Sequence, residues 1–334
     1  MPLARTVLGD VEAASLGITN GHEHLAITGG LITIQHPDYR LDDTRRAIEE
    51  VSDFAGCGGK TIVDATPCGI GRDPEALIAI SKETKVHVIA ATGVHKESYY
   101  LDTHWRFHYG VEEIAGLWEA DVQEGMELSG YEGPIVRRSA ARAGVLKIGT
   151  DYQNIRSATR KAAEAAALTH ARTGVPILTH AELGTMMLEQ VELLNSFGVD
   201  PAHLIISHGD RNPDWFVHRD VAQTGAFLQY DCFGRIKYMP ESTVVDLMRK
   251  MFDLSLGDHV LLGGDNARSS YWKSYGGGPG MAYMLRAFLP RLRREGFTEA
   301  QIEQLAAQNA SRALAFAHID QLATHNGSRT QRLG

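Results

Sequence analysis

The chain has 334 residues, of which 43% are hydrophobic and 22% are charged, and its formal net charge at pH 7 is −8. These proportions are those of a globular protein and exclude a chain that is disordered, collagen-like or coiled-coil throughout. The acidic balance argues against nucleic-acid binding, and no stretch reaches the ~18 apolar residues of a membrane helix. Three cysteines without CxxC spacing, and a start without the apolar core of a signal peptide, indicate a cytoplasmic protein.

Short runs of β-branched and apolar residues alternate with longer helix-like segments along the chain. The predicted strands are, in chain order, residues 16–19, 61–65, 86–92, 145–148, 177–179, 204–207, 226–230 and 260–263. Apolar spacing and composition predict helices over residues 42–54, 157–172 and 183–197, with Ser157 as an N-cap. Gly174 and Gly198, each followed by a proline within three residues, end a helix before the next strand.

Alternating strands and helices predict an α/β fold with a parallel sheet, and eight such units predict a closed (β/α)8 TIM barrel. The alternative is an open doubly wound sheet. That fold favours a Gly-rich dinucleotide fingerprint after its first strand, where this chain reads Asn20-Gly21-His22-Glu23-His24. We expect one domain over residues 1–334, with a helical insertion over 103–133 and a loosely ordered tail over 318–334.

Histidines and one aspartate follow the predicted strands at the edge where barrel enzymes place their catalytic groups. His22 and His24 follow the first strand, while His180, His208 and Asp265 follow the fifth, sixth and eighth. The spacing of His22 and His24 puts both side chains on the same side of an extended chain. One histidine in such a place is usually a hydrogen-bonded loop residue, but this whole set predicts a metal site at the rim.

Lys147 lies within the apolar run Val-Leu-Lys-Ile of the fourth predicted strand. An unpaired ammonium inside a parallel barrel costs several kcal/mol. One interpretation is a salt-bridged lysine whose amine reaches solvent. The other is a neutral amine that reacts with carbon dioxide and becomes a carbamate, an anionic oxygen ligand able to bridge two metal ions.

The residues discussed above belong to five segments: Gly21-His22-Glu23-His24-Leu25, Val145-Leu146-Lys147-Ile148, Thr179-His180, Ile206-Ser207-His208 and Gly264-Asp265. In these segments the chain resembles the phosphotriesterase-related family of the amidohydrolase superfamily, and the resemblance runs from about residue 6 to residue 316. The resemblance implies two divalent metal ions, one held by His22, His24 and Asp265 and the other by His180 and His208. Carboxylated Lys147 would bridge them. Zinc is the metal that imidazole-rich ligation favours, with Mn or Co as alternatives.

Such a centre implies metal-assisted hydrolysis of an ester-like bond. Two metal ions lower the pKa of a bridging water and supply hydroxide at neutral pH. We expect this hydroxide to attack a lactone carbonyl and Asp265 to carry the proton to the leaving group. The alternatives are a phosphotriesterase or an amide or N-acyl hydrolase with the same centre and, in another class, a non-catalytic metal-containing binding protein.

Basic and aromatic residues gather in the loops after the seventh and eighth predicted strands, where many TIM barrels bind phosphate. The candidate substrate-binding residues are Arg235, Lys237, Arg268, Tyr271, Lys273 and Tyr275, together with Tyr99 after the third strand. The alternative is that these cations pair with carboxylates on a solvated surface. Residues 268–280 also resemble the subgroup of the family that opens phosphorylated sugar lactones, which implies a small, anionic, phosphorylated lactone as the substrate.

Two further expectations concern the rest of the chain. His95, His104 and His108 lie near the loop after the third strand and are candidates to line the pocket. The apolar flanks of a barrel are compatible with a homodimer.

Overall fold

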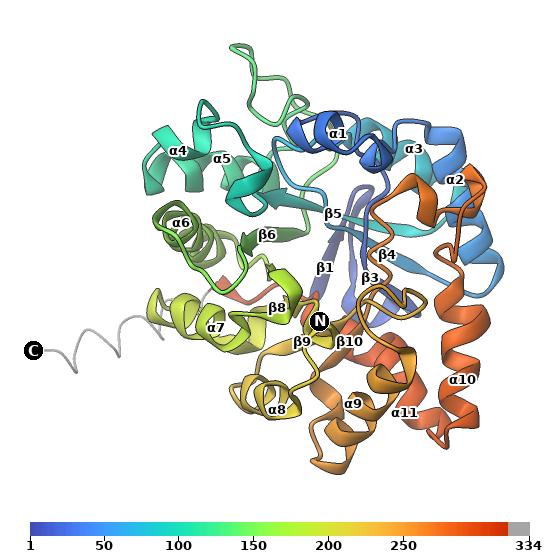
Figure 1. Cartoon of the computed structure of the whole chain (residues 1–334). Helices are drawn as coiled ribbons and strands as arrows, with labels where there is room; N and C mark the ends of the chain where they lie inside the picture. Colours follow the sequence, from blue (N-terminus) through green and yellow to red (C-terminus); the bar gives the residue numbers. More distant parts are fainter. Residues whose placement is uncertain (320–334) are drawn as a thin grey trace, which may run out of the picture.

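The computed structural model describes residues 1–319 and arranges them around eight parallel strands with helices outside (Figure 1). The strands, in sheet order, are β3 (Thr19–Glu23), β4 (Thr61–Asp64), β5 (His87–Gly93), β6 (Val145–Thr150), β7 (Ile177–Ala181), β8 (Leu204–Ser207), β9 (Phe227–Tyr230) and β10 (Val260–Leu262). Each is paired in parallel with the next. The end strands β3 and β10 meet where the amides of Gly264 and Asp265 donate to the His22 carbonyl, at 3.0 and 2.7 Å. The predicted TIM barrel is confirmed.

Helices follow the strands and form the outer ring. After β3 to β9 come α2 (Thr44–Gly56), α3 (Pro74–Thr84), α5 (Val111–Gln123), α6 (Ser157–Thr173), α7 (Met187–Ser196), α8 (Trp215–Gln223) and α9 (Glu241–Asp253). After β10 come α10 (Leu289–Arg294), α11 (Glu299–Glu303) and α12 (Asn309–Ala313). Residues 103–133 contain the short helix α4 (Trp105–His108) and α5, which packs against α6. That this range is an insertion in a single domain stays a prediction.

Apolar side chains form two cores, as a barrel requires. The larger lies between the sheet and the helices, and the smaller fills the barrel interior with residues such as Val63, Ile89 and Leu178. An antiparallel hairpin of β1 (Leu3–Thr6) and β2 (Gly9–Glu12), which the strand prediction missed, adds Ala4 to the inner core. The hairpin is anchored near the start of β5, where the Val7 amide donates to the Val88 carbonyl at 2.8 Å. The opposite, carboxyl end of the barrel therefore carries the polar residues.

Two details differ from the prediction, and the first arises because polar residues in a barrel strand hide it from a search for an apolar pattern. The first barrel strand begins at Thr19, whereas residues 16–19 were the predicted strand, so His22 lies within β3. The preceding Leu16 is buried in the inner core. Helix α6 starts at Ser157 itself, with Arg156 in the N-cap position and no side-chain cap, so the predicted Ser157 cap is wrong.

Among residues 1–319, no helix is long and apolar enough to cross a membrane. The predicted loose tail covered residues 318–334, and all but its first two residues lie outside the described part of the chain.

Candidate metal centre and substrate cavity

A cavity of about 460 Å³ opens at the carboxyl end of the barrel. The predicted ligands His22, His24, His180, His208 and Asp265 all line it. The sixth, Lys147, is fully buried in β6, and its Nζ lies 3.4 Å from His22 Nε2. The structure thus brings together all six side chains from β3, β6, β7, β8 and the loop after β10.

Each of the four imidazoles has one ring nitrogen held by an oxygen of a neighbouring side chain. The contacts are His22 Nδ1 to Gln229 Oε1 at 2.9 Å, His24 Nδ1 to Thr66 Oγ1 at 2.8 Å, His180 Nε2 to Glu182 Oε2 at 2.6 Å and His208 Nδ1 to Asp231 Oδ1 at 2.7 Å. An acceptor at one nitrogen keeps the N–H there and leaves the lone pair on the other nitrogen, which is how ligating histidines are oriented around metals.

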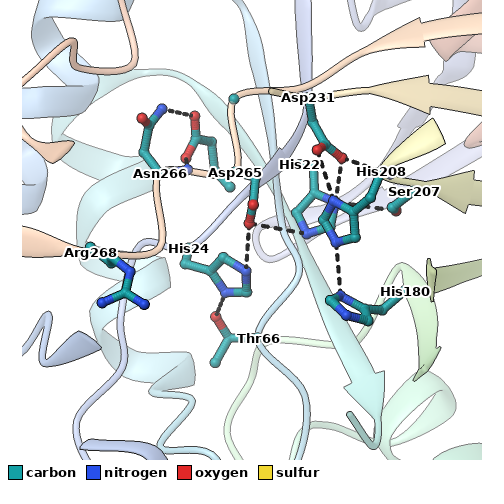
Figure 2. Close-up of polar contacts among 12 residues, drawn as sticks. His22, His24, Thr66, His180, Ser207, His208, Asp231, Asp265, Asn266 and Arg268 are labelled. Carbon is teal, nitrogen blue, oxygen red and sulfur yellow. Dashed lines mark hydrogen bonds and ion pairs between the residues drawn. The ribbon is translucent and has the colours of Figure 1, made fainter. Parts of the chain in front are cut away.

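The remaining ring nitrogens point into a common space (Figure 2). His180 Nδ1 lies 2.8 Å from His208 Nε2, and the Nε2 atoms of His24 and His22 lie 3.6 and 3.8 Å from Asp265 Oδ1. Ligand atoms of His22, His24 and Asp265 all fall within 4.8 Å of one another. Imidazole nitrogens and a carboxylate at this spacing are a donor set that fits a divalent transition-metal ion.

Burial sets the protonation of these groups. It lowers the pKa of His22 and of His208 well below the ordinary range and the pKa of His180 to about 4, so all three rings are neutral, the form that ligates metals. Burial also lowers the pKa of Lys147 to about 7. Its amine is therefore substantially unprotonated at neutral pH, as reaction with carbon dioxide requires.

The backbone of the neighbouring strand β5 lies very close to the backbone of Lys147. Gly93, on the neighbouring strand β5, has a φ of +101°, and a Cβ at this position would lie 2.1 Å from the Lys147 carbonyl oxygen. Only glycine permits this approach.

Asp265 is an ionised carboxylate in this setting. Burial would raise its pKa, but the charges of Arg235 and Arg211 outweigh burial and hold the pKa of Asp265 well below its usual range. Both guanidinium groups contact Asp265 Oδ2, with Arg235 Nη1 at 3.2 Å. Asp265 and His208 also adopt left-handed backbone conformations, with φ of 46° and 65°. Such strain in non-glycine residues is characteristic of functional sites.

The structure separates the predicted substrate-binding residues into two groups. Tyr99, Arg235, Lys237, Arg268 and Tyr271 line the cavity.

Lys273 and Tyr275 are not among the residues that line the cavity, and their assignment to the substrate site stays a prediction. Lys273 Nζ is 3.9 Å from Asp53 on α2, and the Tyr275 ring stacks under Arg46 of the same helix. The chain passes through two short turns, η8 (Ser269–Tyr271) and η9 (Lys273–Tyr275), and the second of these packs against α2. Proximity in sequence to Arg268 therefore does not place Lys273 at the rim of the cavity.

The three further histidines also separate. His95 lines the cavity and stacks on Tyr99, with ring centroids 4.3 Å apart. His104 and His108 line a neighbouring groove instead.

Sequence reasoning missed the residues that hold the imidazoles and Asp265: Thr66, Glu182, Arg211, Gln229 and Asp231. Two of them, Asp231 and Glu182, could have been predicted from their positions in the sequence. Asp231 directly follows β9, as the ligands follow their own strands, and Glu182 lies two residues after His180. The others are defined only by contacts between strands.

A parallel (β/α)8 barrel with converging imidazoles and a carboxylate at the carboxyl ends of its strands defines a TIM-barrel hydrolase of the metal-dependent class. The chain belongs to the phosphotriesterase family, whose model matches residues 2–314.

Individual relatives agree with this membership. The chain is 37% identical over 321 residues to a phospho-furanose lactonase of Mycoplasmopsis agalactiae, covering 93% of this chain and 91% of the relative. It superimposes on the crystal structure of an amidohydrolase from Mycoplasma synoviae with a TM-score of 0.92 at 37% identity, covering 95% of this chain and 93% of that one. It is also similar to a lactonase from Listeria monocytogenes, with a TM-score of 0.88 at 32% identity over 95% and 100% of the two chains. Recognition of the family from its ligand segments is confirmed.

Proposed function

We propose that this protein is a metal-dependent lactonase that opens the ring of a phosphorylated sugar lactone. The names of its relatives support lactone hydrolysis, and the cavity supports an anionic substrate. The observation that carries the proposal is that one cavity combines four oriented imidazoles with two cations, Lys237 and Arg268, that form no ion pair with a carboxylate lining the cavity.

In this proposal His22, His24 and Asp265 would hold one divalent ion and His180 and His208 a second, and Lys147, converted to a carbamate, would supply a further anionic oxygen ligand. Zinc is the proposed metal. Bound divalent ions supply an activated water and polarise the scissile carbonyl.

The protein's own residues have distinct tasks. Asp265, ionised between Arg211 and Arg235, faces the His22 and His24 rings and is placed to accept a proton and return it to the ring oxygen that leaves. The two arginines keep this carboxylate in one orientation. Tyr99 and Tyr271 form part of the cavity wall.

Selectivity for a phosphate rests on the cations that remain available. Arg211 and Arg235 contact Asp265, and Lys96 is paired with Glu182 at 2.5 Å. Within residues 1–319, Lys237 forms no ion pair, and Arg268 is paired only with Asp38, which lies outside the cavity lining, at 3.5 Å.

Lys237 and Arg268 are also close enough to repel each other. Partial burial and then the positive charges of Arg268 and Arg211 lower the pKa of Lys237. A phosphate between the two side chains would relieve this repulsion and gain charge-assisted hydrogen bonds.

The test compares sugar lactones with and without a 5-phosphate on the metal-loaded enzyme. We expect kcat/KM to be at least about tenfold higher for the phosphorylated member of each pair, and Lys237→Ala and Arg268→Ala to remove most of that preference, since hydrogen bonds to charged groups contribute about 1.5–3 kcal/mol. Lys273→Ala is the matched control, because its amine belongs to the same loop but lies outside the cavity. Equal rates within each pair would remove the phosphate from the proposal, and hydrolysis of none of the lactones would remove the lactonase.

A further inference from the structure

A carboxylate in the first loop at the rim of the barrel contacts the last loop. The first loop contains η2 (Pro37–Tyr39), and the last contains η8. About 230 residues separate these loops in sequence, but β3 and β10 are neighbours in the barrel, so the loops meet beside the cavity.

Asp38 accepts three hydrogen bonds across this junction. Its Oδ1 accepts from Ser269 Oγ at 2.8 Å and from the Ser270 amide at 3.0 Å, and its Oδ2 accepts from Ser270 Oγ at 2.8 Å. Arg268 Nη1 lies 3.5 Å from the same Oδ2. One carboxylate thus contacts three successive residues of the last loop.

The neighbouring Tyr39 completes the hold on Arg268. Its ring lies under the guanidinium, with Cζ 4.1 Å from the ring centroid, and its hydroxyl accepts from Nη2 at 3.1 Å. A guanidinium has five N–H donors, so these two contacts orient Arg268 and still leave donors for a ligand.

Asp38 acts through Arg268 and not on the substrate. Arg268, Tyr39 and Tyr271 line the cavity, whereas Asp38 and the two serines do not. The side chain of Asp38 is 37% exposed and that of Arg268 is 23% exposed, so the ion pair lies at the edge of the cavity.

We propose that Asp38 is a positioning residue that holds Arg268 and the last rim loop in the geometry that recognises the anionic group of the substrate. The inference rests on the proposed function and adds to it a determinant of specificity outside the cavity. Without Asp38, the guanidinium and the loop must be ordered by the substrate itself, which weakens binding of the anionic group and leaves the metal site unchanged.

The test is a double-mutant cycle with Asp38→Ala and Arg268→Ala, measured on a matched pair of phosphorylated and unphosphorylated lactones. We expect Asp38→Ala to raise KM for the phosphorylated lactone about five- to twentyfold, with kcat nearly unchanged and the unphosphorylated lactone affected less than about twofold. In the Arg268→Ala background, the same substitution should change KM less than about twofold. Asp42→Ala is the control, since Asp42 lies four residues further along and, among residues 1–319, forms an ion pair with Arg40 alone, at 3.3 Å.

The outcomes separate this inference from the proposed function. Additive effects of the two substitutions, or an unchanged KM in Asp38→Ala, overturn the role of Asp38 while the wild-type preference for phosphate stands. Asp38→Asn keeps an acceptor for the serines but removes the charge, so we expect it to give a KM between those of wild type and Asp38→Ala with kcat nearly unchanged. A general loss of structure would instead lower kcat for both lactones alike in both variants, and that result also overturns the role of Asp38. A wild type without preference for the phosphorylated lactone refutes the proposed function itself.

Discussion

Asp231 offers the sharpest test of how the metal centre is held. It is fully buried at the end of β9, and its Oδ1 accepts from His208 Nδ1 at 2.7 Å, while its Oδ2 accepts from the His208 amide at 3.1 Å. Asp231→Asn conserves volume and one acceptor, but its amide group can donate as well as accept a hydrogen bond, so it no longer fixes the Nδ1–H tautomer of His208. Loss of such a partner costs 10–100-fold in metal affinity or activity, which is about 1.4–2.8 kcal/mol.

The assay is competitive titration of the metal-free enzyme with a divalent ion and a chromophoric chelator. Asp231→Asn should bind the more weakly held ion 10–100-fold less tightly than wild type. Asp210→Asn is the control, because Asp210 is equally buried nearby but accepts from the Cys232 amide and from none of the histidines. Metal affinity within about twofold of wild type in Asp231→Asn would refute the view that this carboxylate orients a ligand.

Four further outcomes follow from the same structure. Lys147→Ala should abolish binding of one ion and lower kcat/KM by at least about 10³-fold, measured by metal analysis and lactone hydrolysis, since it removes the proposed carbamate ligand; retention of both ions contradicts this. Removal of metal by a chelator should lower the melting temperature, and saturating metal should restore it, because an ion that binds only the folded state stabilises it by mass action. Lys273→Ala should leave KM within about twofold of wild type, and a tenfold rise would return this residue to the substrate site. His170, whose pKa burial lowers to about 4 from 6.5, takes up its proton more readily when unfolded, so in the metal-free protein this residue alone should contribute a loss of up to about 3 kcal/mol of unfolding free energy as pH falls from 6.5 to 4; His170→Gln should show a shallower loss in denaturant titrations.

The proposed histidine and aspartate ligands could be brought together from sequence because each lies at, or just after, the end of its own strand. In a barrel all these ends meet at one rim, so no knowledge of side-chain packing was needed to bring His180, His208 and Asp265 together. Lys147 was recognisable because a charged residue in an apolar strand needs a reason.

The boundary of the first barrel strand was wrong for the converse reason. In β3 the side chains of Asn20, His22 and Glu23 form hydrogen bonds with other polar residues at or beside the site, so the strand lacks an apolar pattern. The apolar run over residues 16–19 resembles a strand more closely, although it precedes one. A prediction based on hydrophobicity fails where polar residues of the site occupy strand positions that are apolar elsewhere in the barrel.

Several of the residues that hold the imidazoles and Asp265, and the contacts between the rim loops, could not be predicted from the sequence because they join residues far apart along the chain. Gln229 meets His22 across more than 200 residues, and Thr66 meets His24 across 42. Asp38 reaches Ser270 in the same way, through the closure of the barrel. Lys273 shows that proximity in sequence is a weak guide to the cavity, since it lies five positions after Arg268 but is not among the residues that line the cavity.

We propose that this barrel rim hydrolyses a phosphorylated lactone only when divalent metal is bound. The decisive measurement is the rate of hydrolysis of a phosphorylated furanose lactone as the metal-free enzyme is titrated with a divalent ion and the ions bound per chain are counted. We predict a rate that is negligible without metal and reaches its maximum when two ions are bound per chain. A full rate in the metal-free enzyme, or no hydrolysis with both ions bound, would contradict the account.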